Sequence, residues 1–548
     1  MAVKSENSRA IGANPNTVVD SDTWIRPDDW LALPTPTTHQ MVGLFAVYDN
    51  DTQYLAFTAT ASLGYTVDWG DGVVDNWAGG ATASHTYNYS TLSSPVSSRG
   101  YKMAIVKVYP QSSSTLVALS LYSVNHPSRV ASAHSYNWLD LWINAPNLAT
   151  LSIGGTNSSF TPKMLEQVRI DAWAKTTFSN QFYFCTALQS VILANSSATV
   201  TTCQGMFQSC FALKTAPLFN TATVTSMASM FQSCYALKNV PLYNTANVTS
   251  MSGMFSNCFA LKTVPLFNTV AVTSMSSMFQ ECRSLKTVPL FNTVAVTDMS
   301  NMFNICVVLE SVPLFNTANV TTMSNMFNTC ATLEAVPQFN TIKVTNFNGM
   351  FNGSSSLQSA PSFNCAALTA DSSSMFANCF SLNSIGGLDN SKVTSSSSTA
   401  SAYTNNTQLS SVNLTLAPFS VTFSGCKLSA SQINGIFTNL TTKPSPATVT
   451  SASGNGVSHT YNATAHGFRV GQVVSVTGLT PAGYNVTNAS ITLVSNANSF
   501  TTAGATTGTS TGTGTATISN PVITVTGNPG AATCTTSIAT TKGWTVTV

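Results

Sequence analysis

The middle of the chain repeats one pattern of apolar and polar positions, and most copies are 24 residues long. One copy runs from Met254 and Phe255 through Cys258 and Leu261 to Phe267, with polar residues between these positions. The cysteine position recurs at Cys185, Cys210, Cys234, Cys258, Cys282, Cys306, Cys330, Ser354 and Cys379. A fixed period of this length predicts a solenoid in which each copy forms one coil.

Each copy predicts one short strand, one turn and one helical turn. Leu261, Val264 and Leu266 approximate the spacing at which a strand turns its apolar side chains inward. The Asn-Thr pair that follows is turn-forming, and Val272, Met275 and Phe279 come three to four positions apart, as on a helix. Coils stacked about 4.8 Å apart would give a rod of roughly 40 to 50 Å with continuous apolar columns.

The chain before the repeats is predicted to form an arm and a small β-sandwich. Alternating apolar stretches predict strands at 44–47, 54–57 and 105–108 within a sandwich that covers residues 41–127. Residues 1–40 contain too few periodic apolar positions to fold alone and are interpreted as an extended docking arm. Trp24 and Trp30 of this arm are suited to docking on a partner, and packing back onto the sandwich is an equally good interpretation.

The chain after the repeats is predicted to close the solenoid around an insertion. Ser429 and Gln432 have the spacing of a capping box, and the apolar residues that follow mark one face of a helix that covers the end of the repeat core. We therefore assign residues 128–446 to the solenoid with its capping helix. Residues 447–519, rich in Gly, Ser and Thr, are interpreted as an inserted β-module, and 520–548 as the closing strand and tail.

Composition narrows the range of functions. Only 7% of residues are charged and the net charge is +2, so nucleic-acid binding has little electrostatic support. No apolar run follows the first charges and none elsewhere is long enough to span a bilayer, so we expect neither a signal peptide nor membrane insertion. The twelve cysteines mostly stand singly at equivalent positions of the repeat, and we expect them to be reduced and buried.

Candidate chemistry is sparse, and we expect no enzyme activity, no cofactor and no metal site. The six histidines lack ligand spacing, and no nucleophile, phosphate loop or pair of positioned carboxylates stands out. Asp68, Asp71 and Asp75 could attract a cation, although their Asp-Gly setting is more typical of a tight turn.

One row of charged residues is a candidate ligand-binding face. The position after each strand-starting leucine is occupied by Lys214, Lys238, Lys262, Lys286, Glu310 and Glu334. Stacked at strand spacing, four lysines could receive an acidic glycan or protein, whereas the simpler interpretation is that they solvate a duplicated sequence. The aromatic column of Phe219, Tyr243, Phe267, Phe291, Phe315, Phe339 and Phe363 is predicted to pack in the core, because an exposed stripe would aggregate.

Three segments resemble known families. The run from Asn244 to Leu261 resembles BspA-type leucine-rich repeats, found in surface proteins of bacteria and protists and in phage proteins, which implies adhesion or recognition without catalytic residues. Residues 65–72 with 85–87 resemble a polycystic-kidney-disease (PKD) type immunoglobulin-like fold. Residues 465–474 resemble small β-domains of phage virion proteins. The expected fold is mainly β: an Ig-like sandwich, a leucine-rich-repeat α/β solenoid and an inserted small β-domain.

Together these features favour a bacteriophage virion structural protein, assembled in the host cytoplasm and exposed as a tail fibre or similar appendage that recognises the host surface. A capsid decoration or head-fibre protein and a bacterial surface adhesin are the alternatives. Expected partners are other virion proteins, bound through the arm and sandwich, a glycan or protein of the host surface, and further copies of the chain. On this interpretation a chain lacking its first 130 residues would stay soluble but lose incorporation into particles.

Overall fold

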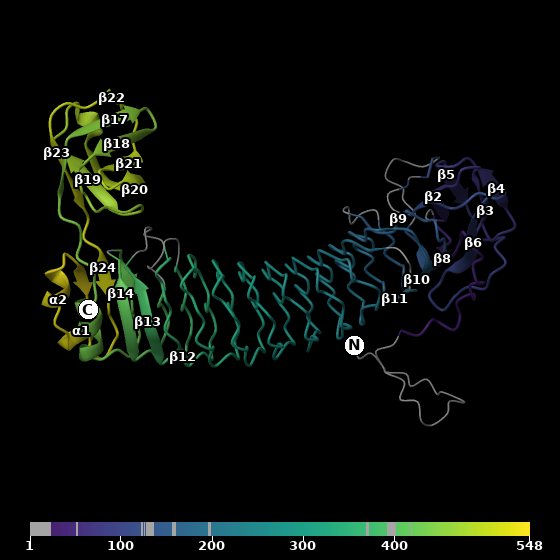
Figure 1. The fold of residues 1–548 in the computed structure, drawn as a ribbon, viewed down its shortest axis with the longest axis horizontal. Helices are drawn as coiled ribbons and strands as arrows, with labels where there is room; N and C mark the ends of the chain where they lie inside the picture. Colours follow the sequence, from purple (N-terminus) through teal and green to yellow (C-terminus); the bar gives the residue numbers. More distant parts are fainter. Residues whose placement is uncertain are drawn as a thin grey trace.

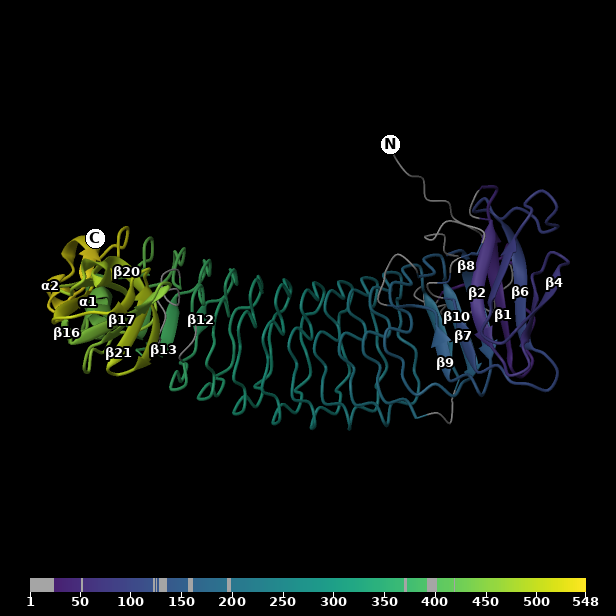
Figure 2. The same ribbon diagram turned by 90° about the horizontal axis from the view of Figure 1, so that it is seen from above.

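The protein is an elongated, gently curved rod with a β-sandwich at one end and a projecting β-module at the other (Figures 1 and 2). The structure is a computed structural model. It describes residues 24–548 except 51–52, 122–123, 125, 128–135, 156–160, 195–198, 369–371, 392–401 and 418. The fold is mainly β and repeats along most of its length, as the sequence predicts.

Two sheets form the N-terminal sandwich. The first contains, in spatial order, β11 (Ser190–Leu193), β10 (Gln167–Ala172), β8 (Trp138–Asn144), β1 (Gln40–Val47), β6 (Lys102–Pro110), β3 (Tyr65–Asp68) and β4 (Val74–Trp77). The second contains β5 (Thr82–Thr86), β2 (Tyr54–Thr60), β7 (Ala118–Ser120) and β9 (Thr150–Ser152). Buried aromatic side chains, among them Phe45, Phe57, Trp69 and Trp138, pack between them.

The first sheet does not end where the sandwich ends. Strand β1 pairs antiparallel with β6 and β8, while β8 pairs parallel with β10, and β10 with β11. The strands of the first coils therefore continue the sheet of the sandwich. Removing residues 1–130 would take away β1 and β6 and expose the buried side chains of Trp138, Leu141 and Ile143. The prediction that such a chain stays soluble is therefore wrong on physical grounds.

The central coils are built from turns and parallel bridges. One bridge per coil joins the serine, aspartate, threonine or asparagine before each Met column, through Ser226, Ser250, Ser274, Asp298, Thr322 and Asn346. The backbone N–H of Met251 donates to Ser274 O at 3.2 Å, and that of Phe255 donates to Met278 O at 2.9 Å. These donors bond to the next coil and not to a residue four positions earlier.

The predicted helical turn is therefore wrong. Two residues of each coil adopt positive φ, as do Ser277 at 55° and Glu281 at 57°. A left-handed residue every four positions stops an α-helix, and it turns the backbone donors toward the neighbouring coil. Three-to-four spacing of apolar residues thus reflects a series of tight turns whose side chains point inward.

Columns of identical side chains fill the core of the solenoid. Phe255, Phe279 and Phe303 stack with ring centroids 5.8 and 5.7 Å apart. The Phe267 column is also buried, in agreement with the predicted core packing. The Cys306 thiol donates to Phe279 O at 3.0 Å, and burial raises its pKa to about 12. Ser354 occupies the cysteine position and its hydroxyl makes the equivalent bond, to Phe327 O, at 2.6 Å.

The C-terminal end closes the column of coils. Its sheets contain β12 (Ser359–Ala360), β13 (Ser384–Asn390) and β14 (Ser411–Leu416), and then β15 (Val421–Thr422), β24 (Val522–Thr524) and β25 (Thr545–Thr547). Helix α1 (Ala430–Thr438) begins at Ser429, whose side chain accepts from the backbone N–H of Gln432, as the capping motif predicts. The short elements η4 (Ala531–Thr533) and α2 (Ser537–Thr540) lie against α1. The end of the core is thereby covered.

An eight-stranded sheet projects from this end (Figure 1). In spatial order it contains β16 (Ala447–Val449), β23 (Gly514–Ile518), β19 (Val473–Thr477), β20 (Val486–Asn496), β21 (Ser499–Ala503), β18 (Ser458–Asn462), β17 (Ser451–Asn455) and β22 (Thr507–Thr509), with η3 (Ala482–Tyr484) before β20. Its core, which includes Tyr461, Tyr484 and Phe500, is separate from that of the solenoid. The module thus has its own apolar interior.

Candidate functional site

The predicted charged row is in register along the solenoid. The backbone N–H of Lys238 donates to Lys214 O at 2.9 Å, and that of Glu310 donates to Lys286 O at 2.9 Å. The side chains of Lys286 and Glu310 form an ion pair at 2.7 Å, and both are more than half exposed. Such an exposed pair contributes little stability. The structure therefore brings the row together as a surface feature that the fold itself hardly uses.

Two further rows lie beside the charged one. The next residue of each coil forms a polar row: Thr215, Asn239, Thr263, Thr287 and Ser311, of which Thr215 and Asn239 form a parallel bridge. Beyond it stands a row of leucines, each 59–65% exposed: Leu218, Leu242, Leu266, Leu290 and Leu314. We call these three rows, from Lys214 to Leu314, the banded face. A contiguous exposed apolar row is unusual on a soluble protein and indicates a contact surface.

The leucine row corrects the sequence-based prediction, which turned Leu266 inward. Leu266 is 60% exposed, whereas the adjacent Phe267 is 1% exposed. Neighbouring residues of an extended segment point to opposite sides, so only one of the two can enter the core. The larger aromatic ring takes the inward position because it buries more apolar surface. Alternation along this segment was the sequence signal that could have revealed the leucine row.

A stack of aromatic rings borders the charged row on its other side. The rings of Phe211, Tyr235 and Phe259 lie parallel, with centroids 4.6 and 4.7 Å apart, and the Arg283 guanidinium caps the stack 4.6 Å from the Phe259 centroid. The ring faces cover one another, so only ring edges remain for a ligand. This stack stiffens the border of the banded face and offers no platform on which a sugar ring could stack.

Trp24 and Trp30, the predicted docking residues, lie against the sandwich. Trp30 is 4% exposed and packs in a cluster with Leu44, Tyr101 and Leu139, and its indole N–H donates to the Tyr101 hydroxyl at 3.1 Å. The Trp24 indole N–H donates to Glu166 Oε2 at 3.2 Å. Residues 24–40 thus adopt the second of the two arrangements considered, packing back onto the sandwich. The part of the arm before residue 24 lies outside the described residues.

Charged residues clamp this segment to the first coils. Arg26 donates from Nε to Asp140 Oδ2 at 2.9 Å. Burial raises the pKa of Asp140, and the hydrogen bond and charge of Arg26 oppose that shift. Glu166 accepts from Arg99 and Trp24, and from Gln189 of the next coil at 3.2 Å. The arm, the sandwich and the solenoid therefore share one polar network.

The aspartates of the sandwich turn are occupied by the protein itself. Asp68 accepts from the backbone N–H of Gly70 at 3.1 Å and pairs with Lys107 at 2.9 Å. Asp71 lies 2.7 Å from the His85 ring, and Asp75 accepts from the Trp69 indole at 2.9 Å. These bonds match the turn interpretation. Within the described parts of the chain, no group of three or more His, Cys, Asp or Glu residues is placed to hold a metal ion.

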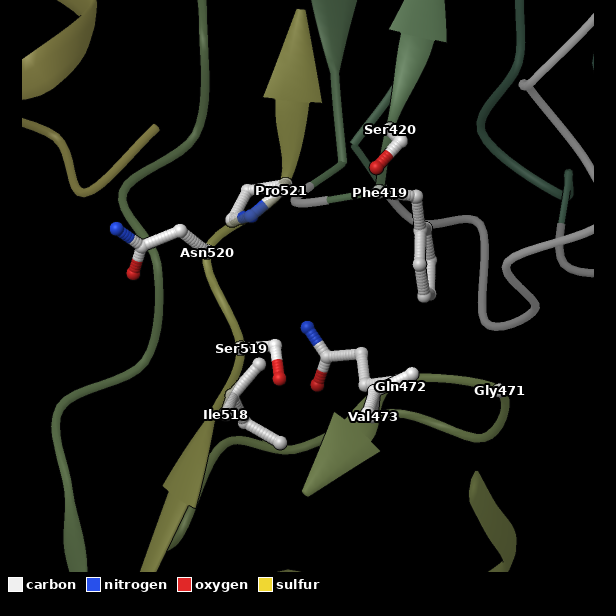
Figure 3. Close-up of a pocket in the computed structure, with 9 residues that line it drawn as sticks. All are labelled: Phe419, Ser420, Gly471, Gln472, Val473, Ile518, Ser519, Asn520 and Pro521. Atoms are coloured by element: carbon white, nitrogen blue, oxygen red, sulfur yellow. The ribbon is translucent and has the colours of Figure 1, made fainter. Parts of the chain in front are cut away.

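A small cavity of about 90 Å³ marks the joint between the module and the solenoid. Figure 3 shows the side chains of Ser519 and Gln472 pointing into it, with Phe419 on the opposite wall. Lys443 bridges the same joint by donating to Asn520 Oδ1 at 2.6 Å. Its lining has no ionisable side chain, and the cavity is a seam between two units.

Comparison with known proteins identifies the repeats. Residues 176–290, 273–387 and 297–412 match the family model described as "Mycoplasma protein of unknown function, DUF285". The matches span the coils and leave out the sandwich and the projecting module. No curated protein matches the chain. In the described residues, no helix is long and apolar enough to cross a bilayer.

Several solved structures show distant similarity. A leucine-rich repeat protein from Eubacterium ventriosum ATCC 27560 is 14% identical, with 50% of this chain and 82% of that chain covered and a TM-score of 0.25. The plant peptide hormone receptor RGFR1, in complex with RGF2, is 13% identical, with 54% and 51% covered and a TM-score of 0.22. TLR13, in complex with ssRNA13, is 15% identical, with 57% and 46% covered and a TM-score of 0.21. The chain spans about half the length of these two receptors. It is a leucine-rich-repeat-like solenoid protein with DUF285 repeats.

Proposed function

We propose that this protein is a non-catalytic recognition rod of a bacteriophage particle, assembled in the host cytoplasm and displayed as a tail fibre or similar appendage. The observation that carries the proposal is the banded face, which presents equivalent side chains at regular intervals along a stiff column. A surface of this kind suits binding in an extended groove or stripe. Eleven buried cysteines without disulfides fit assembly in a reducing compartment.

The sandwich is proposed as the attachment end. Its sheet runs without interruption into the first coils, so an anchored sandwich holds the solenoid in a fixed direction. The projecting module, at the far end of the rod, then lies farthest from the particle (Figure 1). The resemblance of residues 65–72 to PKD-type domains and of 465–474 to phage β-domains belongs to this proposal and awaits its test.

Labelling of purified particles tests the proposal. Antibodies against residues 185–380 and against 447–519 are applied separately and viewed by electron microscopy. We expect both labels at the tail, with the second farther from the particle axis. Label spread over the head makes the protein a capsid decoration. Absence of both labels from particles overturns the proposal and favours a bacterial surface adhesin.

A further inference from the structure

The exposed leucines and lysines of the banded face occur in the same coils. Lys214, Lys238, Lys262 and Lys286 each share a coil with an exposed leucine of the row. Where the charge position becomes Glu334 and Gln358, the leucine position becomes Gln338 and Ser362. Solvation alone needs lysine but no leucine, and core packing needs neither. The two rows end together, which indicates one partner that contacts both.

The dimensions of the face select a helix as that partner. The two rows lie four residues apart along the coil, about 13 Å if the segment is extended. An α-helix with its side chains is about 10–12 Å across, so it fits over the polar row between them. One helical turn advances about 5.4 Å, close to the coil spacing of about 4.8 Å. A slightly tilted helix therefore presents one turn to each coil.

We propose that the banded face binds an acidic amphipathic helix of another protein, with its apolar stripe on the leucine row and its carboxylates beside the lysines. The five leucines span four coil steps, about 19 Å, which corresponds to roughly 13 helical residues. Threonine hydroxyls of the polar row lie beneath the helix and tolerate water at its centre. This proposal names a partner for the recognition surface and so rests on the proposed function.

Peptide binding to the purified full-length chain tests the surface directly. The probe is a fluorescein-labelled 18-residue helix with leucines on one stripe and glutamates along one flank, and its matched control carries lysines in place of the glutamates. Fluorescence anisotropy should show binding of the acidic probe at least tenfold tighter than that of the basic probe. Raising the salt concentration should weaken the acidic probe because exposed charges are screened.

Matched variants locate the binding. Leu266→Ser and Lys262→Glu should each weaken the acidic probe about fivefold, as expected when one contact of a small interface is lost. Leu63→Ser removes a leucine of equal exposure, 59%, on the sandwich, and Lys343→Glu changes the same charge on a residue outside the three rows. Both controls should bind like the parent chain. Circular dichroism of each variant confirms that the coils are intact.

Several results would overturn the proposal. Equal binding of both probes, or binding that Leu266→Ser leaves unchanged, rejects the amphipathic helix. Leucine-dependent binding to phosphatidylglycerol vesicles without probe binding makes the face a membrane contact. Sedimentation that shows a dimer abolished by Leu266→Ser assigns the face to a second copy. None of these results depends on particle labelling, so failure of the helix proposal and failure of the virion proposal are distinguishable.

Discussion

Thr269 offers a direct test of how neighbouring coils are held together. Its hydroxyl donates to Asn292 O of the next coil at 2.7 Å, and its side chain is fully buried. The equivalent threonine of five other coils makes the same bond at 2.8–3.0 Å: Thr221, Thr245, Thr293, Thr317 and Thr341. Thr269→Val removes this donor and keeps the shape of the side chain. The coil contact should then lose one hydrogen bond and no packing.

The cost follows from burial. A buried carbonyl that loses its donor costs about 1–3 kcal/mol, and the added methyl recovers part of this, so we expect about 1–2 kcal/mol. Thr273→Val is the matched control, because the Thr273 hydroxyl donates to Thr249 O at 3.2 Å from an exposed position. Water can replace that bond, so the control should cost less than about 0.5 kcal/mol.

Hydrogen exchange measured by mass spectrometry is the suitable assay, because it reports opening of individual coils and does not require the rod to unfold in one step. Peptides covering 269–297 should exchange about 5- to 30-fold faster in Thr269→Val than in the parent chain. Peptides of the projecting module should be unaffected and serve as an internal reference. If Thr273→Val accelerates exchange as much as Thr269→Val, the buried hydroxyl is not what holds the coils together.

Three further perturbations address packing, backbone strain and pH. Phe279→Ala removes a ring from the buried stack and should destabilise the coils by about 3–5 kcal/mol in urea unfolding, whereas Phe259→Ala, in the half-buried border stack, should cost clearly less. Ile305 has a φ of 61°, unfavourable for a β-branched residue, so Ile305→Asn should stabilise by about 1 kcal/mol and Ile305→Val should not; equal melting temperatures would refute this strain. Burial lowers the pKa of His466, whose Nδ1 accepts from the Phe468 N–H at 2.9 Å. The unfolded state then binds the proton more readily, so the module should be fully stable above the unfolded pKa of about 6.5 and melt at lower temperature as pH falls below it; His466→Gln should flatten that dependence.

The sequence predicted the column of coils because its apolar positions recur at a fixed period. The cysteine position, the inward Phe267 and the cap at Ser429 all follow from local spacing and are found where expected. The helical half of each coil was wrong because positive φ is available to serine, asparagine and even Ile305 when the next coil supplies acceptors. That supply is a property of the stack, and a single copy of the motif does not contain it.

The candidate face was predictable in part. Stacking of equivalent positions follows from the period alone, so the charged row could be written down without a structure. The leucine row could not, because Leu266 and Phe267 compete for one inward position and the outcome depends on the space inside the coil. The packing of Trp30 against Tyr101 joins residues 71 positions apart, and no local pattern indicates such a contact.

The regular column of coils also makes length a heritable variable. Each coil contacts chiefly its two neighbours, so an in-frame gain or loss of 24 residues leaves every remaining contact of the same kind. Such an event would change the reach of the rod by about 4.8 Å and rotate the terminal module by one small step of the solenoid twist. Near-identical copies such as 254–277 and 278–301 favour recombination between them at the level of the gene. A lineage could thus tune how far its module stands from the sandwich without evolving a new fold.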